Sequence, residues 1–150
     1  MRTVKLILFG KLKEPYLRQA CAEYEKRLGA YCKLETIELS PIESKPVVQA
    51  LELEATLAQS KMSKQASVVA LCVEGRQMSS EQFAAWIDAQ PNEIAILIGS
   101  SHGMSDGLKT KANLRLSLSA MTFPHQLARV MALEQLYRAF QINSGGKYHK

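Results

Sequence analysis

The chain has 150 residues, 47% of them hydrophobic, and a formal net charge of +5 at pH 7. This length suffices for one sizeable core but not for two ordinary domains, so we expect a single domain over residues 1–150. No apolar run approaches the roughly 20 residues of a membrane-spanning helix, the first residues lack a secretory pattern, and the three cysteines lack disulfide or zinc-site spacing. We therefore expect a cytoplasmic protein without a membrane segment or a metal, and the positive charge favours a polyanionic partner.

Two kinds of hydrophobic periodicity alternate along the chain. Period-two or continuous β-branched patterns predict strands, whereas apolar residues three and four apart predict amphipathic helices. In chain order we predict a strand at Thr3–Phe9, a helix at Glu14–Leu28, a strand at Lys33–Leu39, a helix from Pro46 to about Met62, a strand at Ser67–Val73, a short helix after the capping-box pair Ser79 and Gln82, strands at Glu93–Ile98 and Leu114–Leu118, and a long helix from Pro124 to about Ile142. This alternation indicates an α/β fold with a mostly parallel sheet flanked by helices.

A loop with two glycines, Gly99 and Gly103, follows the fourth predicted strand. Ligands of α/β proteins bind at the carboxyl ends of strands, and glycine lets backbone amides approach a ligand closely. The loop has neither P-loop nor dinucleotide-fingerprint spacing, and a plain turn explains it equally well from the residues alone. A second glycine segment, Val73–Gln77, is interpreted as a loop after the third strand, again with a plain turn as the alternative.

The segment Leu118–Arg129 joins the last predicted strand to the long helix and is the most informative stretch. It places His125 and Arg129 four residues apart on one helix face. Both residues also have ordinary explanations in packing, hydrogen bonding or ion pairing. The polar tail ends in Tyr148 and His149 between lysines, a set that can stack on a base and contact phosphate, although such tails are often only solvated.

Nearly the whole chain resembles a known family of enzymes. The resemblance rests on the opening segment VKLILFGKLKEPYLRQACAEYEKRLGAY, the strand end ALCVEG, the loop LIGSSHG, the run LSLSAMTFPHQLARVMALEQLYRAFQI and the terminal YHK. These segments are similar to those of the SPOUT-class methyltransferases and, within them, of the RlmH type, which methylates N3 of a pseudouridine in large-subunit ribosomal RNA. The last two segments together are the most specific.

The resemblance implies a C-terminal trefoil knot, S-adenosylmethionine as methyl donor, a homodimer, and 23S ribosomal RNA (helix 69 region) in the ribosome as substrate. The implied catalytic candidates are His125, Arg129, Tyr148 and His149, with the tail of one subunit completing the pocket of the other. The residues expected to bind the cofactor are Leu71, Gly99, Gly103, Leu118, Ser119, Ala120, Met121, Thr122 and Phe123.

Two positions depart from the family pattern. Ser100 stands where a second glycine is common, and Cys72 stands where an acidic residue is common. Two alternative functions stay open: a non-catalytic ribosome-binding or RNA-binding module with the same fold, and an enzyme that uses another adenine-containing ligand in the glycine-loop pocket.

Overall fold

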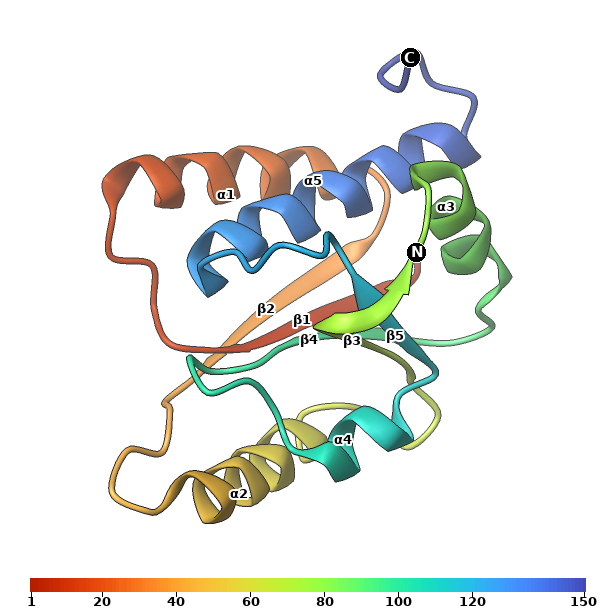
Figure 1. The fold of residues 1–150 in the computed structure, drawn as a ribbon. Coiled ribbons are helices and arrows are strands. Elements are labelled where there is room, and N and C mark those ends of the chain that lie inside the picture. Colours follow the sequence, from red (N-terminus) through yellow and green to blue (C-terminus); the bar gives the residue numbers. More distant parts are fainter.

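The computed structural model describes residues 1–150 as a five-stranded sheet covered by helices on both faces (Figure 1). The strand order is β2-β1-β4-β3-β5, and every neighbouring pair is parallel. The strands are β1 (Thr3–Phe9), β2 (Lys33–Leu39), β3 (Ser67–Gln77), β4 (Ile94–Ile98) and β5 (Leu114–Ser117). The predicted α/β class and parallel sheet are confirmed.

Strands in the middle of the sheet are apolar on both faces, as burial between two helical layers requires. All five residues of β4 are buried, and successive residues serve opposite faces. Ile94, Ile96 and Ile98 belong to the larger core cluster, whereas Ala95 and Leu97 belong to the smaller one. The sheet thus separates two hydrophobic cores.

The helices are distributed unequally over the two faces. Figure 1 shows α1, α3 and α5 on one face and α2 and α4 on the other. Their bounds are α1 (Pro15–Leu28), α2 (Val47–Gln59), α3 (Ser80–Ala89), α4 (Asp106–Lys111) and α5 (His125–Asn143). The longest helix, α5, packs beside α1 and α3 and buries Leu133 and Leu136 in the larger core.

Local signals explain where several helices begin. Pro15 occupies the first turn of α1, where its missing N–H costs nothing. Ser79 accepts a hydrogen bond from the Gln82 backbone N–H at 3.1 Å, and the Gln82 side chain accepts one from the Ser79 N–H at 2.9 Å. The predicted capping box of α3 is therefore confirmed.

The structure corrects two details of the prediction. Residues 73–77, interpreted as a loop, continue β3 to Gln77 after a shift in its pairing with β5. The short helix α4 was not predicted; it begins at the cap residue Ser105, whose side chain accepts a hydrogen bond from the Leu108 N–H at 3.1 Å. The trefoil knot implied by the resemblance stays a prediction.

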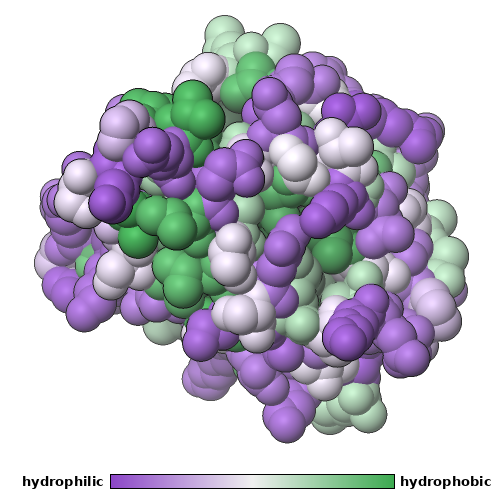
Figure 2. Space-filling view, turned by 90° about the horizontal axis from the view of Figure 1, so that it is seen from below, coloured by the Kyte–Doolittle hydropathy of each residue, from purple (hydrophilic) through white to green (hydrophobic).

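The surface that contains α2 carries several exposed apolar side chains. Figure 2 views the molecule from the α2 and α4 side, and hydrophobic atoms gather on the left, where α2 lies in Figure 1. The exposed apolar side chains of this helix are Val47, Val48, Leu53 and Leu57. No helix combines the length and the apolar character needed to cross a membrane.

Candidate functional site

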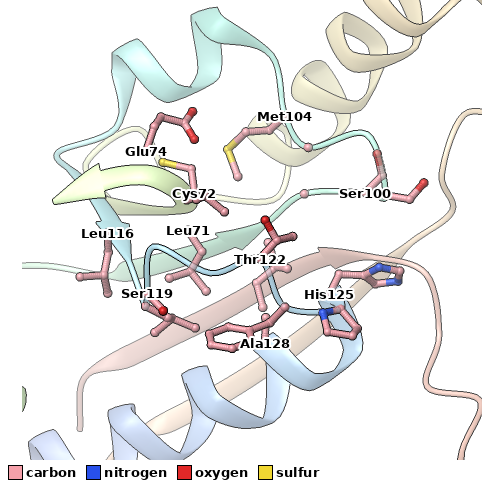
Figure 3. Close-up of a pocket in the computed structure, with 18 of the residues that line it drawn as sticks. Leu71, Cys72, Glu74, Ser100, Met104, Leu116, Ser119, Thr122, His125 and Ala128 are labelled. Carbon is pink, nitrogen blue, oxygen red and sulfur yellow. The ribbon is translucent and has the colours of Figure 1, made fainter. Parts of the chain in front are cut away.

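A cavity of about 600 Å³ lies where β3, β4 and β5 end (Figure 3). Parallel strands bring their carboxyl ends to one edge, which is where α/β folds bind ligands. Three chain segments and α4 form its wall: the end of β3, the glycine loop after β4, and the connection from β5 into α5. The lining residues are Leu71, Cys72, Val73, Glu74, Ile98, Gly99, Ser100, Ser101, Gly103, Met104, Lys109, Leu116, Leu118, Ser119, Met121, Thr122, Phe123, Pro124, His125 and Ala128.

The first wall is an irregularity in β3. The register with β5 jumps between Leu71 and Arg76, so the intervening residues leave the ladder and Cys72, Val73 and Glu74 line the cavity. The Lys109 ammonium of α4 donates to the Glu74 carboxylate at 2.6 Å, and this hydrogen bond lowers the pKa of Glu74. Burial raises the pKa of the Cys72 thiol, which keeps that thiol protonated at neutral pH.

The glycine loop forms the second wall and is tightly folded. The Gly103 N–H donates to the Ser100 carbonyl oxygen at 2.8 Å, and Gly103 has a φ of +86°. A Cβ on Gly99 would collide with the Gly103 backbone, so only glycine fits at position 99 without moving the loop. The Ser100 hydroxyl donates to the buried Glu54 carboxylate at 2.9 Å, which gives this departure from the family pattern a structural partner in α2.

The connection from β5 to α5 forms the third wall and is held by two serines. The Ser117 hydroxyl donates to the Ser119 carbonyl oxygen at 2.8 Å. The Ser119 hydroxyl accepts a hydrogen bond from the Met121 N–H at 3.0 Å. These bonds curve the chain around the cavity. Ala120 is exposed and does not line the cavity.

His125 and Arg129 begin α5 but have different surroundings. His125 is partly buried and lines the cavity. Arg129 does not line it; its side chain is 7% exposed, and its guanidinium donates to the Glu38 carboxylate of β2 at 2.7 Å. The Arg129 Nε has no hydrogen-bond partner. The contacts of Arg129 in this chain are those of a buried ion pair.

The C-terminal tail is ordered against the outer helices. His149 Nε2 lies 2.7 Å from a carboxylate oxygen of Glu81, and its Nδ1 lies 3.0 Å from Nη1 of Arg138. The Tyr148 hydroxyl donates to Glu134 at 3.3 Å, and burial together with a hydrogen bond to Tyr24 raises the pKa of Tyr148 to about 12. These contacts bring Tyr148 and His149 together, away from their own chain's cavity.

The structure gathers most of the predicted site residues. Every predicted cofactor-binding residue except Ala120 lines the cavity, as does His125 among the catalytic candidates. Sequence reasoning did not assign Glu74, Ser100, Met104 or Lys109 to the site. Glu74 lies in the glycine segment Val73–Gln77, for which a plain turn was the alternative, and Lys109 lies in the unpredicted helix α4. Both the β3 irregularity and this six-residue helix depend on tertiary packing.

The comparisons with known proteins agree with this geometry. The family model described as "Predicted SPOUT methyltransferase" matches residues 1–149. The chain belongs to the SPOUT methyltransferase family. Two SPOUT relatives named Ribosomal RNA large subunit methyltransferase H, from Bacillus cytotoxicus and Bacillus thuringiensis, are 46% and 45% identical to it, and each alignment covers 98% of this chain and 99% of the relative.

Two solved structures have a similar fold at low sequence identity. A probable methylase family protein from Haemophilus influenzae has a TM-score of 0.59 and 14% identity, and the match covers 98% of this chain and 70% of the Haemophilus chain. A Ribosomal RNA small subunit methyltransferase E from Neisseria gonorrhoeae, bound to S-adenosyl methionine, has a TM-score of 0.57 and 10% identity. This match covers 95% of the present chain and 66% of the Neisseria chain. At these identities the likeness extends to the fold alone.

Proposed function

We propose that this chain uses S-adenosylmethionine to methylate N3 of a pseudouridine in the helix 69 region of 23S ribosomal RNA, on the ribosome. The observation that carries this proposal is the 46% identity, over almost the full length of both chains, to a relative named for methylation of large-subunit ribosomal RNA. The Neisseria structure, whose title names bound S-adenosyl methionine, supports the choice of methyl donor.

The cavity suits a nucleoside-sized cofactor. Pockets for small ligands measure roughly 300–1,000 Å³, and this one measures about 600 Å³. Apolar surface comes from three lining leucines, Leu71, Leu116 and Leu118. Because Gly99 and Gly103 have no side chains, a ligand can approach the backbone of the glycine loop closely. When bound, S-adenosylmethionine would supply a methyl group already activated for transfer.

The remaining task for the protein is to align the acceptor and to remove its proton. Methylation forms a bond between N3 and the methyl carbon, breaks the bond between that carbon and sulfur, and releases the N3 proton. His125 is the one catalytic candidate that lines the cavity in the same chain, so we assign it the role of holding or accepting this proton. Arg129 would act indirectly, by fixing the start of α5 through Glu38.

A homodimer would explain the position of the tail. Arg138, the partner of His149, follows His125 by 13 residues of one helix, or about 20 Å along its axis. Tyr148 and His149 therefore serve a partner's cavity in this proposal rather than their own. The exposed apolar side chains of Met121, which lines the cavity, and of Leu127 would supply part of the interface.

Two measurements test the proposed activity. Mass spectrometry of 23S ribosomal RNA from a strain lacking the chain should show an unmethylated pseudouridine, and re-expression should restore the methyl group. Calorimetry should show that S-adenosylhomocysteine binds, whereas ATP and NAD do not. Binding with no change in the RNA would indicate a non-catalytic module, and preference for ATP or NAD would indicate a different enzyme.

Subunit mixing tests the shared site. Deletion of Lys147–Lys150 and the His125→Ala substitution should each abolish methyl transfer while S-adenosylhomocysteine binding persists. Mixed dimers of the two variants should recover activity, because one cavity then has both an intact His125 and an intact partner tail. Full activity of the truncated protein would remove the tail from the site.

A further inference from the structure

A second cavity of about 580 Å³ adjoins the cofactor cavity. It lies at the carboxyl ends of β1 and β2, between the segment that follows each strand and the start of α2. Ser100, Ser101 and His125 line both cavities, so the two spaces meet at the glycine loop and the start of α5. A molecule in the second cavity would face a cofactor in the first across these residues.

Its shape depends on how β1 ends. Gly10 has a φ of +97°, and its N–H donates to the Leu39 carbonyl oxygen at 2.8 Å, which joins the ends of β1 and β2. A Cβ on Gly10 would lie 3.9 Å from Nε2 of His125, so the imidazole stands directly over this turn. The Lys13 N–H donates to the Gln126 side chain at 3.3 Å and fixes the next part of the wall to α5.

The lining of the second cavity carries three lysines without a salt bridge, against two carboxylates that have no cationic partner. Lys11, Lys13 and Lys45 line it, all three are exposed, and none forms a salt bridge. Three carboxylates also line it, and two of them, Glu38 and Glu54, already have hydrogen-bond partners, whereas Glu43 forms no salt bridge. Glu38 is paired with Arg129 at 2.7 Å, and Glu54 accepts hydrogen bonds from Ser100 and from the Ile42 N–H.

Unpaired lysines around a cavity of this size suit a nucleotide within a nucleic-acid strand. Lysines bind phosphates without regard to sequence, and a base must leave its stack to enter an enclosed site. We propose that the second cavity holds the flipped-out target nucleotide, with the flanking phosphates on Lys11, Lys13 and Lys45 and the base edge at His125. This assignment rests on the proposed function, because it takes the adjoining cavity as the cofactor site.

The test compares two triple variants with the same change in charge. The first replaces Lys11, Lys13 and Lys45 with glutamine. The control replaces Lys26, Lys64 and Lys111, which are exposed, unpaired and outside both cavities. Each protein is assayed for methyl transfer to ribosomes from a strain lacking the chain, for S-adenosylhomocysteine affinity, and for binding of a fluorescently labelled single-stranded oligouridine over a range of salt concentrations.

The first variant should raise the KM for ribosomes at least tenfold while cofactor affinity stays within twofold. Its affinity for the oligouridine should fall. The slope of log affinity against log salt concentration should become shallower by about 2, because each of the three lost phosphate contacts to a single strand contributes roughly 0.7. The control should change each quantity less than twofold. Unchanged RNA binding in the first variant, or an equal loss in the control, overturns the proposal. If neither ribosomes nor their RNA are methylated by the unmodified chain, the proposed function fails, and the oligouridine measurement still decides the cavity's role.

Discussion

Replacing Gly99 with alanine tests the glycine loop with the smallest possible change. A Cβ at this position would lie 2.5 Å from the Gly103 carbonyl carbon, whereas carbon atoms prefer a separation of about 3.5 Å or more. The loop must therefore move by about 1 Å. Overpacking of this kind costs about 1–3 kcal/mol, which corresponds to a loss of S-adenosylhomocysteine affinity of about 5- to 150-fold. Movement of the loop would also break the Gly103 to Ser100 hydrogen bond, at a cost of about 1 kcal/mol in unfolding free energy.

Titration calorimetry measures the affinity, and urea denaturation measures the stability. Gly107→Ala is the matched control, because Gly107 lies in α4 and an added Cβ there meets no atom within 4 Å. The control should bind normally and gain about 0.5–1 kcal/mol from the better helix propensity of alanine. Unchanged affinity in Gly99→Ala would refute the assignment of the glycine loop to the cofactor site. A large loss of stability with normal affinity would show that the glycine serves folding alone.

Three further predictions concern the core, the buried ion pair and the tail. Leu133→Ala should lower the unfolding free energy by about 2–5 kcal/mol in urea denaturation, because Leu133 is 1% exposed; a loss below 1 kcal/mol would contradict its place in the core. Glu38→Ala should lower the unfolding free energy by about 3 kcal/mol, because this substitution leaves the Arg129 guanidinium buried without its carboxylate. Arg129→Met should lower it by less, and a larger loss in Arg129→Met than in Glu38→Ala would refute this explanation. The pKa of Tyr148 is raised from 10 to about 12, so its contribution to tail docking is complete below pH 10 and is lost as pH rises towards 12. A titration followed by phenolate absorbance should show a late phase that Tyr148→Phe abolishes. A titration of the unmodified protein without this late phase would count against the contacts of Tyr148.

The strands were predictable because their hydrophobic pattern is local. The bounds of β1 and β2 match the prediction, and those of β4 and β5 differ by one residue. The end of β3 was not predictable, because Glu74 and Gly75 resemble a turn and become a strand irregularity only against β5. There a Cβ on Gly75 would lie 2.8 Å from the Arg115 backbone. Helix α4 was missed because six residues are too few for a periodic pattern.

The site was predictable where it depends on the resemblance and not where it depends on packing. The family pattern pointed to the glycine loop and to the connection before α5, and the structure brings these segments together around one cavity. It could not reveal that Arg129 meets Glu38, a residue 91 positions away. Nor could periodicity indicate that Tyr148 and His149 fold back on the outer helices, since a short polar tail carries no core pattern.

The central pairing of the sheet also bears on how the protein folds during synthesis. β1 lies between β2 and β4, and Val4 pairs with Ile94, a partner roughly 90 residues later in the chain. While translation proceeds, one edge of β1 can pair with β2, but the other has no strand to join until more than half of the chain has been made. Contacts of such long range slow folding because a large loop must close before they form. We therefore expect the sheet to be completed late, with the nascent β1–β2 pair exposing an apolar edge that favours aggregation when synthesis stalls.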